Sequence, residues 1–334
     1  MEEHVSLKNY NSFGIDASAR YFAKFSDVST LAALLASNPG LPTFILGGGS
    51  NILLTRDVAG IVLKNEISGI SLVKEDERHV YLKAGAGENW HQFVQFCIQK
   101  NLAGVENLSL IPGNVGASPM QNIGAYGVEI KDVFHSLEAY HLTERKLVEF
   151  SLSDCEFGYR ESVFKGKLRG QFVITAVTFR LSKQPVFNVS YGAIQQELEL
   201  MGVTELSIAN ISAAVIRIRS SKLPNPAVIG NAGSFFKNPT IDEAHYRDLK
   251  TRFPSLVAYE LGNNNFKLAA GWLIEQCGWK GYRKGDAGCH DKQALVLVNY
   301  GNATGAEVLA LSNEIIESVY KKFSVELSRE VNII

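Results

Sequence analysis

The sequence predicts mixed α/β or α+β domains, because segments with strand periodicity alternate with segments of helical periodicity and no repeat or low-complexity stretch interrupts them. With 334 residues, 46% of them hydrophobic, the chain can form two or three domains of about 150 residues each. Its 33 basic and 34 acidic residues are interspersed and leave a net charge of −1. This balance gives no global field that favours nucleic acid or an anionic membrane, so a bound anion needs a local site.

The amino-terminal segment and the cysteines bear on the cellular compartment. Residues 1–4 are acidic and lack an apolar stretch, and no apolar run reaches the roughly 18 residues that span a membrane. We therefore expect a cytoplasmic protein without membrane insertion. Four cysteines without Cys-x-x-Cys spacing favour reduced thiols: Cys97, Cys155, Cys277 and Cys289. Cys289 and His290 are adjacent but have no second pair of ligands nearby, so we expect no metal site.

The first part of the chain alternates helix, strand and loop. Apolar periodicity predicts a helix at about 29–37 and a short buried strand at 43–46, which leads into a glycine-rich loop. The same order then recurs, with a strand at 80–84, the loop 85–87 and a second helix. The apolar side chains of this helix share one face, and we expect them in a core: Trp90, Phe93, Val94, Cys97 and Ile98.

The carboxyl-terminal part of the chain is expected to end in a helix and a strand. A long amphipathic helix is marked by Val308, Leu311, Ile315, Val319 and Tyr320. A strand around 325–333 follows, and it must pair with an earlier segment because its backbone groups need partners. Further upstream, the alternating Arg217 and Arg219 are expected on one face of an extended segment.

Three glycine-rich loops occur in the first 130 residues, at 47–51, 85–87 and 111–127. Glycines let successive backbone N–H groups approach a phosphate closely, and such loops form anion-binding concavities. A dinucleotide is the natural ligand. None of the loops fits G-x-G-x-x-G, and no G-x-x-x-x-G-K-[ST] segment is present, so neither a Rossmann nor a P-loop site is supported. Each loop alone is typical of a tight turn, but the three together favour a ligand site.

A fourth glycine-containing segment, residues 230–239, carries a candidate reactive side chain. Gly230 and Gly233 allow the backbone to bring Ser234 close to a ligand. The alternative is a tight turn that caps a strand. A role as nucleophile is disfavoured, because the segment does not read Gly-x-Ser-x-Gly and no histidine lies nearby in the sequence.

These segments together resemble one enzyme family. In order along nearly the whole chain, the match consists of 47–51, 111–113, 121–127, 157–165 and the Ser234 segment Gly-Asn-Ala-Gly-Ser-Phe-Phe-Lys-Asn-Pro. This pattern resembles the UDP-N-acetylenolpyruvoylglucosamine reductases (UDP-N-acetylmuramate dehydrogenases) of bacterial cell-wall synthesis, in their subtype with a tyrosine loop. The resemblance implies an α+β, non-Rossmann, two-subdomain FAD-binding fold of the vanillyl-alcohol-oxidase type, with a third, α/β substrate-binding domain.

The resemblance also implies a division of the chain into domains. FAD-binding subdomain 1 would comprise 1–67 plus 322–334, so that the terminal strand returns to the first subdomain. Subdomain 2 would comprise 68–218, with the tyrosine-loop insertion near 183–200. The substrate-binding domain would comprise 219–321, and the enzyme is expected to be a monomer.

The implied reaction is the NADPH-dependent reduction of UDP-N-acetylglucosamine enolpyruvate to UDP-N-acetylmuramate in peptidoglycan precursor synthesis. NADPH would reduce a non-covalent FAD, and flavin N5 would pass the hydride to C3 of the enolpyruvyl group. Ser234 matches the residue that protonates C2. Because negative charge develops toward the substrate carboxylate, the site needs cationic or proton-donating partners there.

Arg160 and Glu330 match the family residues that supply those partners. Arg160 lies in a Gly-Tyr-Arg motif, and its guanidinium offers a planar fork to a carboxylate. Its alternative reading is a surface arginine in an ion pair. Glu330 lies in the terminal Leu-x-x-Glu-Val, where like charge and burial would raise its pKa and let it donate a hydrogen bond.

Binding residues follow from the same resemblance. The implied cofactor contacts are Gly47, Gly48, Gly49, Ser50, Asn51, Ile111, Pro112, Gly113, Ser118, Asn122, Ile123, Gly124, Tyr159 and Arg219. The implied substrate contacts are Tyr126, Tyr191, Lys222, Lys237, Asn238, Tyr259, Lys267, Lys280 and Gln293. Taken singly, each lysine reads as a solvated surface charge, whereas together they would supply the cations that a pyrophosphate needs.

Two other functions stay open. A flavin-dependent sugar-alcohol oxidase of the same fold should lack the Ser234 segment and should react with oxygen. A non-catalytic nucleotide-binding regulator is disfavoured by the intact set of Arg160, Ser234 and Glu330.

Overall fold

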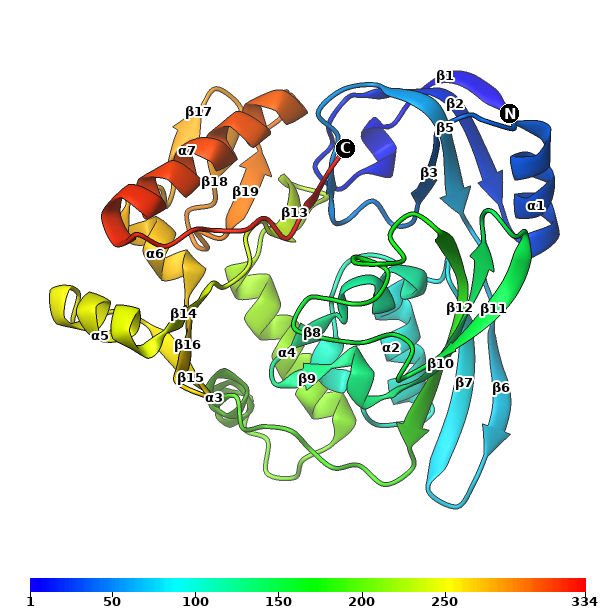
Figure 1. Cartoon of the computed structure of the whole chain (residues 1–334). Coiled ribbons are helices and arrows are strands. Elements are labelled where there is room, and N and C mark those ends of the chain that lie inside the picture. Colours follow the sequence, from blue (N-terminus) through cyan, green and yellow to red (C-terminus); the bar gives the residue numbers. More distant parts are fainter. The chain divides into compact units, whose positions relative to one another are not determined.

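The chain passes several times between two structural units, each assembled from discontinuous segments. The computed structural model describes residues 1–334 (Figure 1). Unit 1 consists of Met1–Val5, Ala19–Gly48 and Ala59–Ser221, and unit 2 consists of Ser6–Ser18, Gly49–Val58 and Lys222–Ile334. The three-domain division expected from the sequence stays a prediction.

The first sheet of unit 1 has the strand order β1 (Glu2–Ser6), β2 (Ser18–Phe25), β5 (Val58–Asn65), β3 (Thr43–Leu46). Helix α1 (Val28–Ser37) begins after Asp27, whose carboxylate caps it by accepting from the Thr30 N–H. Leu31 of α1 packs with Phe25, Ile61 and Leu63 of the sheet. The expected helix and strand are therefore confirmed, but the strand is only partly buried, because Leu46 alone of its four residues is shielded.

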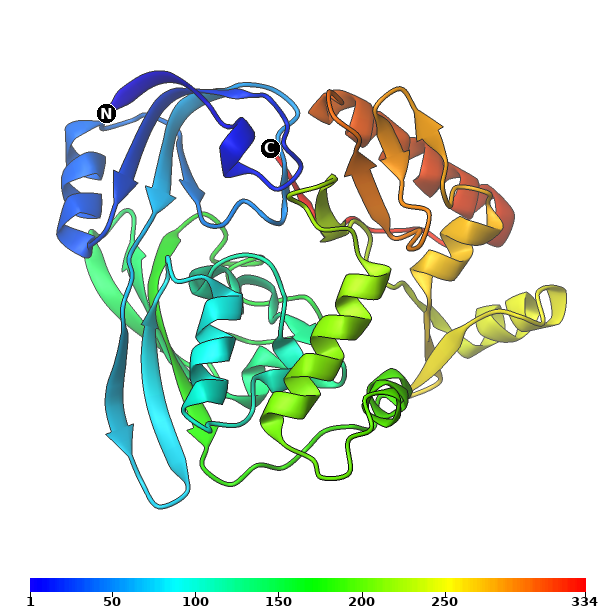
Figure 2. The ribbon, with the colours of Figure 1, turned by 180° about the vertical axis from the view of Figure 1, so that it is seen from behind.

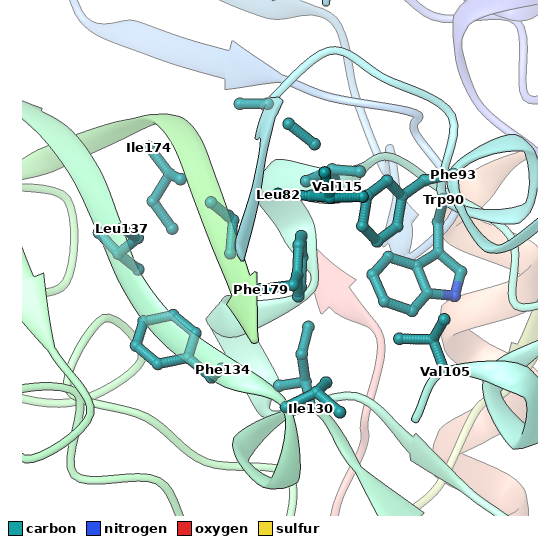
Figure 3. Packing of buried hydrophobic residues seen from close by; sticks show 14 of the residues in the cluster. Leu82, Trp90, Phe93, Val105, Val115, Ile130, Phe134, Leu137, Ile174 and Phe179 are labelled. Atoms are coloured by element: carbon teal, nitrogen blue, oxygen red, sulfur yellow. The ribbon is translucent and has the colours of Figure 1, made fainter. Parts of the chain in front are cut away.

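The second sheet of unit 1 is antiparallel and has the order β11 (Lys146–Ser151), β10 (Phe134–His141), β12 (Phe172–Ser182), β7 (His79–Gly85), β6 (Ile70–Glu75). Helix α2 (Trp90–Gln99) covers one face of it (Figures 1 and 2). Trp90 and Phe93 of α2 meet Phe179 of β12, with the Phe93 and Phe179 ring centroids 4.6 Å apart (Figure 3). The expected apolar face is confirmed, with Ile98 partly buried at its edge.

Short elements connect α2 to the sheet: η2 (Glu106–Leu108), η3 (Val115–Ala117), η4 (Pro119–Gln121), β8 (Gly124–Ala125), β9 (Val128–Glu129) and η5 (Ile130–Asp132). Two helices, α3 (Gly192–Leu200) and α4 (Ile208–Lys222), follow β12 and pack on each other through a small apolar cluster.

The expected extended segment around Arg217 and Arg219 is wrong, because both residues lie on α4. Ile211, Val215 and Ile218 recur at helical spacing and are buried, and this period overrides the local alternation. Residues two apart on a helix point about 200° away from each other. Arg217 is accordingly exposed, with its Nε 3.3 Å from Glu197 Oε1, whereas Arg219 is partly buried.

Unit 2 contains two small antiparallel sheets, besides a two-stranded parallel pair at the carboxyl end. The first has the order β13 (Gly230–Ser234), β19 (Val296–Asn299), β18 (Ala287–Cys289), β17 (Arg283–Lys284), and helix α7 (Gly305–Phe323) packs along it (Figure 1). The second has the order β14 (Thr240–Asp242), β16 (Asn265–Leu268), β15 (Ala258–Gly262). The remaining helices of the unit are α5 (Glu243–Arg252), α6 (Ala270–Gln276) and the short 3₁₀ helix η1 (Lys8–Tyr10).

The long amphipathic helix predicted near the carboxyl end is α7. Thr304 and Glu307 form a capping box at its start. Val308, Leu311, Ile315 and Val319 are buried as expected. Tyr320 is not, because it is 58% exposed and Phe323 takes the buried position that continues the spacing of four residues.

The terminal strand pairs with an earlier segment, as expected, but the pairing is short. Strand β20 (Asn332–Ile333) runs parallel to β4 (Ile52–Leu53). Before β20, Arg329 forms an isolated antiparallel bridge with Phe236. The stretch 325–327 is anchored instead by the buried side chains of Val325 and Leu327.

The cysteines are all free, and three of them are buried. Burial raises the pKa of Cys155 and of Cys289 to about 12, which keeps both thiols protonated at neutral pH. None of the helices is long and apolar enough to cross a membrane.

Gly305 should be far more sensitive to substitution than Gly192, although each is the first residue of a helix. A Cβ on Gly305 would lie 1.8 Å from the Leu54 carbonyl oxygen, whereas a Cβ on Gly192 meets nothing within 4 Å. We expect Gly305→Ala to lower the free energy of unfolding by about 1–3 kcal/mol through overpacking. Gly192→Ala should leave it unchanged or raise it slightly. Urea unfolding followed by circular dichroism measures both, and equal midpoints would contradict this reading.

Candidate functional site

The three glycine-rich loops predicted from the sequence come together in unit 1. A Cβ on Gly48 would lie 2.7 Å from Asn114 Oδ1 and 2.8 Å from the Gly113 Cα, so these two loops touch only because residue 48 has no side chain. A Cβ on Gly47 would meet nothing within 4 Å, and its carbonyl accepts a 2.8 Å hydrogen bond from Lys64 Nζ. The backbone at Gly47 is therefore fixed and borders open space.

The loop at 85–87 packs on the loop at 113–116 by backbone contact. The Val115 N–H donates to the Glu88 carbonyl at 2.8 Å, and Asn114 Nδ2 donates to the Gly87 carbonyl at 2.8 Å. A Cβ on Gly116 would lie 2.5 Å from the Ala86 Cβ, which explains why this position is a glycine. A loop cluster held in this way presents backbone rather than side chains to a ligand, as a phosphate or flat cofactor requires.

Two of the predicted cofactor residues shape this loop cluster with their side chains. Ser118 Oγ donates to the Val115 carbonyl at 2.6 Å. The Asn122 amide donates to Glu129 Oε2 at 3.0 Å and to the Gly158 carbonyl at 3.1 Å. Asn122 thereby ties the loop to the turn that carries Arg160. The neighbouring predicted residues Ile111, Pro112, Ile123, Gly124 and Tyr159 lie in the same two segments.

Arg160 and Arg219 bring two guanidinium groups to one region of unit 1. Arg160 has a positive φ of 55° in the turn at 158–161, and its Nη2 donates to the Gly124 carbonyl at 2.7 Å. Arg219 Nε donates to the Leu110 carbonyl at 3.3 Å. Burial, and also the charge of Arg160, lower the pKa of Arg219. Two cations beside exposed loop backbone suit a flat, electron-rich ligand that carries phosphate or carboxylate groups.

Tyr126 and Tyr191 meet edge to face next to Arg219. Their ring centroids are 5.3 Å apart at an angle of 88°. Burial raises the pKa of Tyr126, and the hydrogen bond with Arg219 opposes that shift. Tyr191 is 47% exposed and immediately precedes α3. Two predicted substrate residues are thus adjacent to a predicted cofactor residue.

Asn107 connects the segment before Tyr191 to the turn at Tyr126. Its buried Nδ2 donates to the Tyr126 carbonyl at 3.1 Å and to the Asn188 carbonyl at 2.9 Å. Asn188 Nδ2 in turn donates to the Gly127 carbonyl at 3.1 Å. These bonds hold a partly exposed segment without secondary structure in a defined position.

In unit 2, Ser234 and Glu330 lie on neighbouring extended segments. The Glu330 N–H donates to the Phe235 carbonyl at 2.8 Å, and the Lys237 N–H donates to the Ser328 carbonyl at 2.9 Å. Residue 235 thus bonds to residue 330 and residue 237 to residue 328, so the two segments run antiparallel on either side of the isolated bridge between Phe236 and Arg329. The two predicted proton donors therefore occupy the same part of unit 2.

The backbone at Ser234 departs from a regular strand. The register between β13 and β19 shifts between Asn231 and Ser234, and Gly233 has a φ of 69°. Asn231 Oδ1 accepts from the Gly233 N–H at 2.9 Å and stabilises this irregularity. Such bulges commonly re-aim a side chain beside a site.

Asn51 joins the same part of unit 2. Its Nδ2 donates to the Glu330 carbonyl at 3.4 Å, and its carbonyl accepts from Asn332 Nδ2 at 2.9 Å and from the Asn332 N–H at 3.1 Å. The end of the glycine-rich loop at 47–51 is therefore fixed to the carboxyl-terminal segment that carries Glu330.

The remaining predicted substrate residues are distributed over unit 2. Asn238 Oδ1 accepts from the Ala270 N–H at 3.0 Å, and Gln293 Oε1 lies 3.0 Å from where a Cβ on Gly271 would be, so both flank the start of α6. Tyr259 and Lys267 are partners across β15 and β16. Lys280 pairs with Glu275 at 2.9 Å, and Lys222 is exposed at the end of α4.

Sequence reasoning missed three side chains that organise the site. They are Lys64, which holds the Gly47 carbonyl, His91, which accepts from the Leu110 N–H at 3.0 Å, and Asn107. Each is a polar residue within an apolar pattern, which is the one sequence feature that could have drawn attention to them.

Comparisons with known proteins agree with one another over the whole chain. The model of the UDP-N-acetylenolpyruvoylglucosamine reductase C-terminal domain matches residues 225–334, and an FAD binding domain model matches residues 20–147. Proteins named UDP-N-acetylenolpyruvoylglucosamine reductase from Amoebophilus asiaticus and Flavobacterium johnsoniae are 51% and 47% identical, covering 100% of this chain and 99% of each relative. The crystal structure of such a reductase from Thermus caldophilus superposes with a TM-score of 0.69 at 25% identity, covering 99% of this chain and 98% of that one.

Replacing Asn107 with leucine should release the segment at 183–191. Two carbonyls would lose their buried donor, and a lost buried hydrogen bond costs about 1–3 kcal/mol, which corresponds to about fivefold to 150-fold more opening. We expect Asn107→Leu to accelerate limited proteolysis within this segment by about that factor, as followed by mass spectrometry. Asn38→Leu, which removes a similar amide-to-carbonyl bond at the end of α1, is the control and should not change cleavage there. Equal cleavage rates in both variants would show that Asn107 does not hold the segment.

Proposed function

The chain belongs to the UDP-N-acetylenolpyruvoylglucosamine reductase family, and we propose that it reduces UDP-N-acetylglucosamine enolpyruvate to UDP-N-acetylmuramate at the expense of NADPH. It is an FAD-dependent oxidoreductase. The observation that carries the proposal is that Ser234 and Glu330 lie on neighbouring, hydrogen-bonded segments of unit 2, in a chain whose relatives over its whole length bear the reductase name.

The loop cluster of unit 1 suits FAD. Gly47 borders open space, and the contacts of Gly48 and Gly116 leave backbone rather than side chains at the surface of the cluster. We assign the FAD contacts to this cluster, to Arg219, and to Gly49, Ser50 and Asn51 at the far end of the first loop. When bound, FAD supplies the two-electron chemistry that side chains lack.

The substrate reaction adds hydrogen across a carbon–carbon double bond. C3 gains a hydride, C2 gains a proton, and NADPH is oxidised to NADP⁺, so electrons and charge balance. Ser234 holds the proton for C2 on its hydroxyl, and the irregular backbone at Gly233 aims that hydroxyl. A hydroxyl is a weak acid, but the acceptor carbon is strongly basic at the moment of transfer.

Arg160 and Glu330 act on the substrate carboxylate. The Arg160 guanidinium offers two parallel N–H donors to its oxygens, and the positive φ that fixes the arginine turn orients this fork. Glu330, protonated, donates a hydrogen bond to the same group as negative charge develops there.

Nucleotide binding is assigned to the tyrosine pair and to polar residues of unit 2. Tyr191 covers the bound substrate, which assigns the enzyme to the subtype with a tyrosine loop. Contacts to the UDP moiety are assigned to Tyr126, Lys222, Lys237, Asn238, Tyr259, Lys267, Lys280 and Gln293. The cations among them balance the pyrophosphate charge.

The proposal includes a monomeric enzyme that works in the cytoplasm. Four free thiols fit a reducing compartment. Light scattering coupled to size exclusion tests the monomer. A sugar-alcohol oxidase and a non-catalytic regulator are not favoured, because the relatives over the whole chain are named as reductases.

Ser234→Ala should separate the two halves of the reaction. Flavin bleaching by NADPH under anaerobic conditions should stay within about twofold of wild type, because this half needs no proton on C2. Reoxidation by the enolpyruvyl substrate should slow by at least about a hundredfold, the usual contribution of a positioned proton donor. Ser328→Ala, on the neighbouring segment, is the control and should affect neither half. Equal slowing of both halves would remove Ser234 from this role.

Tyr191→Phe should weaken substrate binding without a comparable loss of turnover. Removing one hydroxyl that bonds the substrate costs about 1 kcal/mol, so KM for the enolpyruvyl substrate should rise roughly fivefold. Steady-state rates at saturating NADPH measure KM and kcat separately. Tyr320→Phe, an exposed tyrosine on α7, serves as control. An unchanged KM would contradict the assigned substrate contact.

A further inference from the structure

Leu110 has an unusual backbone conformation directly before the predicted cofactor residues 111–113. Its φ is 59°, in the left-handed region. A bulky residue rarely adopts this conformation, since its Cβ crowds the backbone at a cost of about 1–3 kcal/mol. Something in the surroundings must therefore hold Leu110 in place.

Both backbone polar groups of Leu110 are held by side chains from two different helices. The Leu110 N–H donates to His91 Nδ1 of α2 at 3.0 Å. The Leu110 carbonyl accepts from Arg219 Nε of α4 at 3.3 Å. The left-handed residue is therefore clamped at both of its hydrogen-bonding groups.

The same helices also hold the residues on either side. Trp90 Nε1 donates to the Leu108 carbonyl at 2.9 Å, and the Trp90 N–H donates to the Gly113 carbonyl at 3.0 Å. Ser109 Oγ shares a 2.8 Å hydrogen bond with Ser212 Oγ of α4. Residues 108–113 are thus fixed at their start, middle and end, and Leu110 is the one strained residue within them.

His91 can accept from an N–H only when Nδ1 carries no proton. The acceptor role therefore requires a neutral ring with its proton on Nε2, and a protonated ring would oppose one N–H with another. Burial, and then the charge of Arg219, lower the pKa of His91, which favours the neutral form. The other titratable and charged groups around this clamp are Tyr126 and Arg160, which face Arg219, and Glu106 on η2. The Glu106 carboxylate accepts from the Gly104 N–H.

We propose that His91 is a positioning residue for FAD, whose neutral ring, together with Arg219, holds Leu110 in the left-handed conformation and so presents the backbone of residues 111–113 to the cofactor. The inference rests on the assignment of residues 111–113 to FAD in the proposed function. His91 acts through Leu110 and need not touch the cofactor.

The clamp makes FAD affinity depend on pH in one direction. Above the ordinary histidine pKa of about 6.5 the ring is neutral with and without FAD, and affinity is constant. Below it, the protonated ring must lose its proton before the loop can form, so affinity falls by up to about tenfold per pH unit. Because the lowered pKa is that of the clamped ring, the fall begins near the ordinary pKa of about 6.5, which the unclamped ring has, and ends below the lowered pKa of the clamped ring.

The test measures the dissociation constant of FAD by fluorescence quenching on apo-protein, from about pH 8 down to about pH 5 across the histidine range. His91→Leu removes the acceptor and should weaken FAD binding about tenfold near neutral pH, the worth of one buried hydrogen bond. His91→Asn keeps an acceptor oxygen near the Nδ1 position but cannot titrate. It should bind FAD within about threefold of wild type, with no loss at low pH.

His141→Leu is the matched control, because His141 Nδ1 also accepts a backbone N–H, that of Glu144, at 2.9 Å in the same unit. It should keep the wild-type affinity and pH profile. The inference is overturned if His91→Leu binds FAD like wild type, or if His91→Asn retains the wild-type fall at low pH. Should His91→Leu fail to fold, the comparison of His91→Asn with wild type decides alone. FAD binding with the expected profile but no turnover of the enolpyruvyl substrate would refute the proposed function and leave this inference standing.

Discussion

Backbone-to-backbone contact among glycine loops is the constraint on which the site in unit 1 depends. A Cβ on Gly48, Gly87 or Gly116 would lie between 2.5 and 2.7 Å from the nearest atom of a neighbouring loop, closer than real Cβ atoms approach. With these side chains absent, the Val115 and Gly116 N–H groups donate to the Glu88 and Ala86 carbonyls outside any sheet. The loops then need no regular secondary structure to be rigid. Glycine gives a chain more conformational freedom than other residues do, and these contacts remove that freedom in the folded loops. The backbone is therefore held in a fixed arrangement before a ligand binds.

In unit 2, the candidate site residues are held in place by hydrogen bonds between segments that are far apart in the sequence. Ser234 and Glu330 are far apart in sequence, yet the bonds between residues 235–237 and 328–330 place their two segments side by side. Asn51 then connects this pair to the first glycine loop. Closing such a long loop costs entropy that grows only slowly with length, and the buried face of α7 offsets it. The carboxyl terminus is thereby a structural part of the site, because β20 completes the pairing with β4.

The sequence could predict those features that repeat along the chain. Periodicity located α1, the buried face of α2 and most of α7, because several residues contribute to each pattern. The prediction was wrong for Tyr320, which is exposed, and for Arg217 and Arg219, which lie on a helix. In both cases it depended on only one or two residues rather than on a repeated pattern. The glycine loops and the positions of Ser234 and Glu330 were recognisable from motifs. Lys64, His91 and Asn107 were not, because each bonds to a backbone group, and a backbone group of a distant residue leaves no trace in side-chain type.

In the first glycine-rich loop, Gly48 and Gly49 both exclude a side chain, but each does so because of a different neighbour. Gly48 belongs to unit 1, where its missing Cβ admits Gly113 and Asn114. Gly49 belongs to unit 2, where a Cβ would lie 2.0 Å from the Tyr10 carbonyl oxygen, and its φ is 64°. Alanine at either position disturbs a separate packing contact, and only Gly49 adds backbone strain. A run of three glycines therefore need not mean three phosphate contacts. Here Gly48 and Gly49 answer first to packing within their own units, and Gly47 is the glycine of the run at which no such contact exists.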